Sequence, residues 1–206
     1  MSNEAKTKVD MDPKYLVKLT VTLFVTCVIV AGLLGFVNKL TLPNITAANE
    51  RKTAVAIQEV LPEMEGSPAV VELTDEMTAA ASGAGATVTE AYEAQAGGNV
   101  IGHALKIVAS GSQGNIVMMV GVDAEGAVTG VSIVSNSETS GIGSKVMNNE
   151  PLTSGTGVLD QFIGKSAADG ELTVGKNVDA ISGATVSSKG VATGVNAALA
   201  VAGLLG

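Results

Sequence analysis

An uncharged, apolar segment near the N-terminus constrains this chain more than any other feature. Leu19 to Val37 read LTVTLFVTCVIVAGLLGFV, and the charged side chains of Lys18 and Lys39 flank them. A helix over these residues would span about 30 Å, which matches the hydrocarbon core of a bilayer. A helix buried in a globular domain normally carries a polar stripe, whereas only scattered threonines interrupt this segment. We therefore predict a transmembrane helix at residues 19–38, after a leader at residues 1–18.

A cleaved signal peptide is the alternative interpretation of the same segment. The apolar run is longer than the roughly 7–15 residues typical of signal peptides, and no A-x-A cleavage site follows it immediately. These features favour an uncleaved anchor. The charges that flank the run barely decide its orientation, because basic residues occur on both sides of it.

The composition of the chain excludes several classes of function. The net charge is −8 and basic residues do not cluster, which argues against binding of nucleic acid. Cys27 is the single cysteine, so the chain alone can form neither a disulfide framework nor a cysteine-rich zinc or iron–sulfur site. His103 is the single histidine, which argues against a histidine metal site and is expected to be an ordinary sheet side chain. We therefore predict no metal site and no conventional catalytic residue.

Residues 39–86 are expected to form a helical connector. Pro43 disfavours helical geometry in the preceding residue and is expected to end the membrane helix. A second helix should begin near Thr46 or Asn49 and should end before Pro62. Further predicted features are a short helix near Leu73–Ala81 and a flexible segment, AAASGAGA, at Ala79–Ala86.

From Thr87 onward the pattern changes to an alternation of β-branched and polar residues, which is typical of strands. Gly97 and Gly98 suit the turn of a first hairpin, and the DAEG segment suits the turn of a second. Four neighbouring strands with short turns indicate an antiparallel sheet, and hence an α+β class with flanking helices. The predicted strands are Thr87–Gln95, Asn99–Ser110, Asn115–Val122 and Ala127–Ser135. The predicted helices beyond them are Lys145–Asn149, Gly157–Ile163 and Ser187–Leu205.

The segment from Val178 to Ser188, VDAISGATVSS, contains the most informative pattern in the chain. An acid precedes a Gly-Ala pair that admits close backbone approach, and several hydroxyl side chains then lead into a predicted helix. The free N–H groups and the positive end of a helix favour an anion, so a phosphate site is one interpretation. A hydroxyl that merely caps the helix is the other.

The string DAISGATVSS also resembles the flavinylation motif of FMN-binding domains in membrane redox complexes. In that family the threonine after Gly-Ala is esterified to the phosphate of FMN by a separate flavin transferase. The resemblance implies a covalent link at Thr185, with Ser182, Gly183 and Ala184 completing the motif and Asp179 matching its leading acid. Such domains occur in the G subunit of the Rnf complex and in the C subunit of the sodium-pumping NADH:quinone reductase.

Four other strings extend the resemblance over most of residues 39–206. TLPNI resembles the family's T-x-P-x-I, GSQG takes the place of its G-Y-G-G, and LDQFIGK resembles its QF-x-GK segment. NSETSGIG resembles H-x-E-T-P-G-L-G, with Asn, Ser and Ile in place of His, Pro and Leu. The resemblance implies that Glu138, Thr139, Gly141 and Ile142 belong to the flavin pocket.

The resemblance is closest to the Rnf G subunit and implies what the chain does. It implies a single-pass subunit of the bacterial inner membrane, with a cytoplasmic leader and an extracytoplasmic FMN-binding domain at residues 87–206. Its FMN would relay electrons within a complex that couples ferredoxin:NAD oxidoreduction to Na⁺ or H⁺ movement. The implied partners are the other membrane and iron–sulfur subunits of that complex and the flavin transferase.

Two alternatives remain open from the sequence. One is the C subunit of the sodium-translocating NADH:quinone reductase, which shares the motif. The other is a membrane-tethered binding or assembly module that carries no flavin.

Overall fold

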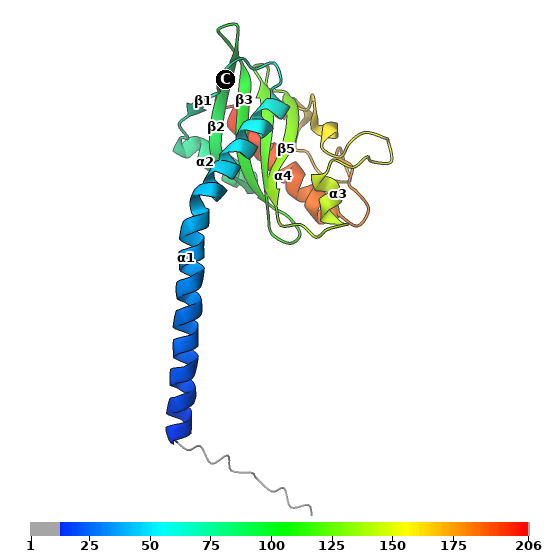
Figure 1. Ribbon diagram of the computed structural model, residues 1–206. Helices are drawn as coiled ribbons and strands as arrows, with labels where there is room; N and C mark the ends of the chain where they lie inside the picture. The colour runs from blue at the N-terminus through cyan, green and yellow to red at the C-terminus, as the bar shows by residue number, and fades with distance from the viewer. Residues whose placement is uncertain (1–12, 206) are drawn as a thin grey trace, which may run out of the picture. The chain divides into compact units, whose positions relative to one another are not determined.

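The computed structural model describes residues 13–205, which begin with a long helix, α1 (Pro13–Val60) (Figure 1). The first twelve residues of the expected leader therefore lie outside the described residues. An 18-residue window of α1 has a mean hydropathy of 2.4 and is 0% buried. Within residues 13–205, α1 is the one helix long and apolar enough to cross a membrane, as predicted. The chain divides into two units, and the second begins at Glu50.

The prediction that Pro43 ends the membrane helix is wrong, because α1 continues through this residue to Val60. Proline has no N–H, so the carbonyl of Lys39 lacks its intrahelical donor. Ending the helix would leave several more backbone groups without partners, which is less favourable than one missing bond. The hydroxyl of Thr46 donates to the carbonyl of Leu42 at 3.0 Å in the following turn.

Five antiparallel strands form one sheet in which neighbours in sequence are neighbours in space. The strands are β1 (Ala69–Val71), β2 (Ala86–Ala96), β3 (Asn99–Ser110), β4 (Asn115–Asp123) and β5 (Val128–Asn136). The predicted class and both predicted hairpins are confirmed, and Gly97 and Gly98 adopt positive φ in the β2–β3 turn. The prediction missed β1, because three residues are too few to show an alternating pattern.

The helices that follow α1 are short, apart from the last one. They are α2 (Asp75–Gly83), α3 (Gly143–Met147) and α4 (Thr185–Ala202), with 3₁₀ turns η1 (Asp160–Phe162) and η2 (Ala167–Asp169). The predicted helix near Leu73–Ala81 is confirmed as α2. The flexible segment predicted at Ala79–Ala86 is wrong, since it holds the end of α2 and the start of β2. Ala81 is fully buried there, so its small side chain serves close packing rather than flexibility.

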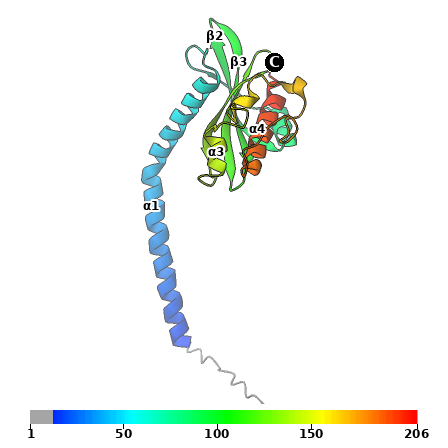
Figure 2. The same cartoon turned by 90° about the vertical axis from the view of Figure 1, so that its right-hand side faces the viewer.

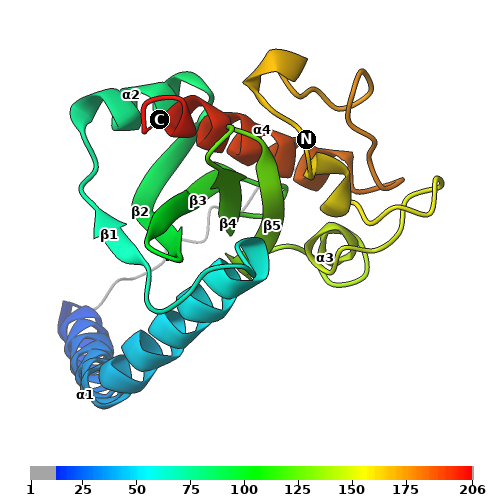
Figure 3. The same ribbon diagram turned by 90° about the horizontal axis from the view of Figure 1, so that it is seen from above.

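Both faces of the sheet are covered. Helix α4 lies along one face together with α2, whereas the last turns of α1 lie along the opposite face (Figure 3). Met118 and Met119 are neighbours on β4, and each is fully buried in a different cluster, one on each face. The sequence pattern predicts only one core-facing side for this strand. The second unit therefore includes much of the segment that the sequence suggested as a connector.

A polar tie fixes the last turns of α1 against the sheet. The Lys106 ammonium donates to the Glu90 carboxylate at 2.8 Å and to the Thr53 hydroxyl of α1 at 3.1 Å. The Tyr92 hydroxyl donates to the other oxygen of Glu90 at 2.5 Å. Burial alone would raise the pKa of the Glu90 carboxyl, but the hydrogen bonds from Lys106 and Tyr92 hold the pKa below its ordinary value. The tie therefore joins α1 to β2 and β3.

We expect Gly121→Ala to lower the free energy of unfolding by about 1–3 kcal/mol. A Cβ at Gly121 would lie 2.7 Å from the Val60 carbonyl oxygen, so α1 would have to move away from β4. The measurement is urea unfolding of the full chain in detergent, followed by circular dichroism. Gly83→Ala is the matched control, because nothing lies within 4 Å of the added methyl group. Equal stability of the two variants would contradict the close packing of α1 on the sheet.

We expect the His103 imidazole to titrate below pH 6.5 in an NMR experiment. Burial lowers the pKa of this side chain, and the Glu93 carboxylate across the strand pair offsets the effect only in part. The contribution of His103 to stability should therefore be complete above pH 6.5, and should be lost as the pH falls through that value and through the lower pKa of the folded state. Glu93→Gln should lower the midpoint further. A midpoint at or above 6.5 would contradict the burial.

Candidate functional site

A cavity of about 300 Å³ lies where the N-terminus of α4 meets the loops that follow β3 and β5. Each of the three segments contains one of the strings singled out in the sequence. Helix α3 begins at the end of the loop that follows β5 and lies beside α4 (Figures 1 and 2). The cavity is lined by Ser112, Gln113, Glu138, Thr139, Ile142, Gly143, Gly183, Ala184, Thr185, Val186 and Ser187.

The N-terminus of α4 supplies an exposed hydroxyl and a set of backbone donors. Thr185 is the first residue of this 18-residue helix, and Gly183, two residues earlier, turns the chain toward the helix with a φ of 84°. The first hydrogen bond of the helix runs from the Ser188 amide to the Ala184 carbonyl at 3.0 Å. Ala184 occupies the N-cap position of α4, and no side chain of the described residues forms a capping hydrogen bond there. The amides of the first turn are therefore free for an anion, which the helix dipole also favours.

Glu138 joins the three segments that surround the cavity. One carboxylate oxygen accepts hydrogen bonds from the Ser112 amide at 2.6 Å and from the Gln113 amide at 3.4 Å. The other oxygen accepts one from the hydroxyl of Ser187 on α4 at 2.8 Å. Hydrogen bonds to a carboxylate are stronger than those between neutral groups. The negative charge of Glu138 is thus held at a fixed place beside the α4 N-terminus.

Two glycines allow the Glu138 carboxylate to lie this close to the backbone. A Cβ at Gly111 would overlap one carboxylate oxygen, and a Cβ at Gly143 would overlap the other. Neither glycine has a positive φ, so space rather than backbone conformation requires glycine here. Glycine at these two positions is the sequence signal for the close approach.

The segment before α4 is tied to η1. The Asp179 amide donates to the Gln161 side-chain oxygen at 2.8 Å, and the Gln161 side-chain nitrogen donates to the Asp179 carbonyl at 3.1 Å. The LDQFIGK string therefore supports the flavinylation-like string directly. The Asp179 side chain is exposed, and this residue does not line the cavity.

The structure brings together six of the nine residues that the sequence suggested for a cofactor. Those that line the cavity are Glu138, Thr139, Ile142, Gly183, Ala184 and Thr185. Ser182, Gly141 and Asp179 lie near the lining residues in sequence but outside the cavity wall. The cavity is also lined by five residues that were not predicted as cofactor ligands from the sequence, namely Ser112, Gln113, Gly143, Val186 and Ser187. Ser112 and Gln113 contribute backbone N–H groups, so the chemistry of their side chains does not indicate a role in the site.

The arrangement suits a ligand with a phosphate at one end and an apolar ring system at the other. The α4 N-terminus offers donors to the phosphate, and the Thr185 hydroxyl lies beside them. The side chains of Ile142 and Val186 line the cavity while remaining 53% and 56% exposed, which offers apolar surface to a ring. Among the described residues, no histidine, cysteine, lysine or arginine lines the cavity, so it offers no imidazole base and no thiolate. The residues present therefore fit FMN.

Fold and site together define an FMN-binding domain attached to a helix that can span a membrane. Residues 111–200 match the family described as the FMN-binding domain. The chain is 35% identical to the G subunit of the Na⁺-translocating ferredoxin:NAD⁺ oxidoreductase complex of Acetobacterium woodii, over 96% of this chain and 97% of that protein. It is 29% identical to the G subunit of the ion-translocating oxidoreductase complex of Methanosarcina acetivorans, over 91% and 95% of the two chains.

A third relative agrees with the first two. The G subunit of the proton-translocating ferredoxin:NAD⁺ oxidoreductase complex of Clostridium ljungdahlii is 34% identical, over 52% of this chain and 57% of that protein. The chain belongs to the family of G subunits of ion-translocating oxidoreductase complexes. The resemblance identified from the sequence is therefore confirmed.

We expect Ser187→Ala to lower the free energy of unfolding of the flavin-free protein by about 1–3 kcal/mol. The Ser187 hydroxyl is buried and donates to a charged carboxylate, which would lose one of its donors. Urea unfolding measures the effect. Ser182→Ala is the control, because its side chain is exposed and its removal should change stability by less than about 0.5 kcal/mol. Equal unfolding of the two variants would contradict the role of Glu138 as the junction of the site.

Proposed function

We propose that this chain is the membrane-anchored electron-transfer subunit of an ion-translocating ferredoxin:NAD oxidoreductase complex, and that it carries FMN esterified to Thr185. The membership of the G-subunit family supports the first part. One observation carries the second part, namely that Thr185 begins α4 in the same cavity as Glu138 and Thr139. These residues are 46 or more positions apart in sequence and come from the two strings that resemble the family's motifs.

The residues of the chain have distinct roles in this proposal. FMN, when bound, supplies both one-electron and two-electron transfer, so the protein needs only to hold the group, adjust its potential and control access. The Thr185 oxygen would carry the phosphate, and the first amides of α4 would donate hydrogen bonds to it. Ile142 and Val186 provide apolar contact.

Charge near the flavin is also set by this chain. The Glu138 carboxylate disfavours additional negative charge in the cavity, whereas backbone N–H groups favour it. The Ser112 and Gln113 amides and the Ser187 hydroxyl donate to Glu138, so part of its charge is already compensated within the protein.

The placement in the cell is part of the proposal. Residues 19–38 of α1 cross the bacterial inner membrane once, with residues 1–18 in the cytoplasm and the FMN-binding domain outside it. A covalent link is useful on that side, because a dissociating cofactor would be lost to the surroundings. Maturation then requires a flavin transferase, and function requires the other membrane and iron–sulfur subunits of the complex. None of the named relatives is a C subunit of the NADH:quinone reductase.

We expect Thr185→Ala to abolish covalent flavin. The full chain is expressed in membranes with an active flavin transferase, then denatured and examined by in-gel fluorescence and intact mass. The wild-type chain should gain the mass of FMN less one water, and the variant should gain nothing, because the esterified oxygen is missing. Thr185→Ser keeps a hydroxyl and should retain fluorescence, whereas Ser182→Ala and Ser188→Ala test the neighbouring hydroxyls and should not lose it.

The same variant separates electron transfer from assembly. The complex that contains Thr185→Ala should assemble but should not transfer electrons from ferredoxin to NAD. Full activity of that complex would contradict the proposed function. A colourless wild-type chain, with the transferase active on another substrate, would instead favour a binding module without flavin.

A further inference from the structure

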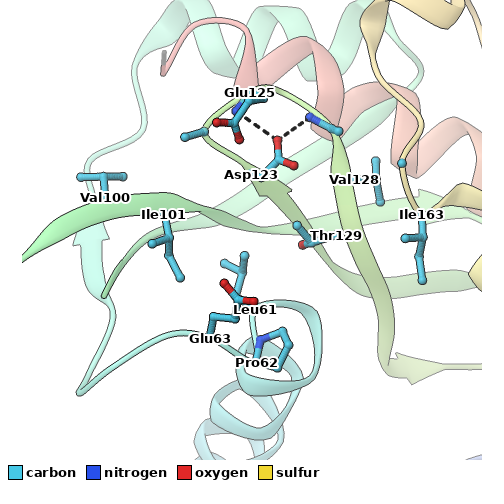
Figure 4. A pocket seen from close by; sticks show the side chains of 13 residues that line it. Leu61, Pro62, Glu63, Val100, Ile101, Asp123, Glu125, Val128, Thr129 and Ile163 are labelled. Carbon is cyan, nitrogen blue, oxygen red and sulfur yellow. Dashed lines mark hydrogen bonds between the residues drawn. The ribbon is translucent and has the colours of Figure 1, made fainter. Parts of the chain in front are cut away.

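A cavity larger than the one at Thr185 lies away from the proposed flavin site. It is an open groove of about 660 Å³ between the end of α1, the start of β3 and the turn that joins β4 to β5. Leu61, Ile101 and Thr129 approach it from three different segments (Figure 4). We call it the acidic groove and define it by its apolar residues Leu61, Val100, Ile101 and Ile163 and its acidic residues Glu63, Asp123 and Glu125.

The acidic groove combines apolar surface with uncompensated negative charge. Val100 and Ile163 are 42% and 53% exposed, although both are large aliphatic side chains. No lysine or arginine of the described residues lines the groove. These carboxylates would repel a phosphate group, and no helix N-terminus of the described residues lines the groove to offset that repulsion, so the groove suits FMN less well than the cavity at Thr185 does.

The three acidic residues are not equivalent. One oxygen of Asp123 accepts hydrogen bonds from the Glu125 amide at 3.1 Å and the Ala127 amide at 2.8 Å, so this residue shapes the turn (Figure 4). Within residues 13–205, no hydrogen bond or ion pair engages the carboxylates of Glu63 and Glu125, and both residues are exposed. Glu63 and Glu125 are therefore available to a binding partner.

The surface around the turn that joins β4 to β5 is also both acidic and apolar. A second cavity, of about 530 Å³, shares Val100, Asp123 and Glu125 with the acidic groove. It adds Glu93 and, at the end of α4, the apolar residue Leu205. Again no lysine or arginine of the described residues lines it. The surface thus extends from the end of α1 to the end of α4, and it shares no residue with the cavity at Thr185.

The charge of the domain decides which occupant fits. Residues 39–206 carry about twice as many acidic as basic side chains, so a second copy of this chain would bring like charge to the groove. Anionic lipid headgroups would be repelled for the same reason. A segment with basic residues beside apolar side chains would satisfy both the carboxylates and the exposed aliphatic groups.

We propose that the acidic groove binds a basic and apolar segment of another subunit, and thereby docks this domain in its complex. The identity of that subunit as a member of the oxidoreductase complex rests on the proposed function. The charge and shape of the groove do not depend on the proposed function. Because the groove and the cavity at Thr185 share no residues, docking and flavin attachment should be separable by substitution.

The first test compares two doubly charge-reversed variants in the affinity-purified complex. Glu63→Lys/Glu125→Lys should reduce the amount of this chain that co-purifies by at least about tenfold, whereas Glu72→Lys/Glu171→Lys should not, since it changes the net charge equally outside both cavities. An immunoblot quantifies the chain, and in-gel fluorescence reports the flavin separately. Loss of fluorescence in every sample would contradict the flavin proposal alone. Unchanged co-purification of the groove variant would overturn the docking proposal.

A second test identifies the occupant. Cys27→Ser removes the single cysteine of the chain, and Glu125→Cys then carries a thiol-linked photo-crosslinker into the groove. The proposal predicts an adduct with another subunit, at a peptide that contains lysine or arginine beside aliphatic residues. The same label at Glu72→Cys should not give that adduct. An adduct with a second copy of this chain, with lipid, or with nothing would overturn the proposal.

Discussion

The carboxylate of Glu138 is the interaction on which the geometry of the proposed site depends. It accepts hydrogen bonds from the loop after β3 and from α4, and it belongs to the loop after β5. These segments are far apart in sequence, and Glu138 links them by hydrogen bonds, while the packing of α4 on the sheet holds the helix in place. Gly111 and Gly143 leave the space that the carboxylate fills. The site is therefore a shell of backbone donors and hydroxyls around a fixed negative charge, with the N-terminus of α4 at its edge.

The sheet relates the site to the rest of the chain. Helix α4 lies on one face and the last turns of α1 lie on the other, so the end of the anchor helix is part of the domain core. Lys106 and Glu90 add a polar tie between that helix end and the sheet. Gly121 allows the Val60 backbone to lie directly on β4. Because the last turns of α1 belong to the domain core, we expect these turns and the sheet to move as one body.

The parts of the fold that follow from local pattern were predictable, and those that follow from tertiary contact were not. The alternation of strand residues and the Gly97-Gly98 turn located the hairpins closely. The rule that proline ends a helix failed at Pro43, because one missing backbone hydrogen bond costs less than the several that a helix end would leave unmade. For the site, the resemblance pointed to Thr185 and Glu138. The contributions of the Ser112 and Gln113 amides could not be predicted, because almost every residue has an N–H and only the fold aims it.

An experimental structure of the flavinylated full chain would show where the flavin is attached and which residues contact it. We predict continuous density from the Thr185 oxygen to a phosphate that accepts hydrogen bonds from the first amides of α4, with the ring system against Ile142 and Val186. Density for the flavin in the acidic groove, or on a hydroxyl other than that of Thr185, would contradict it.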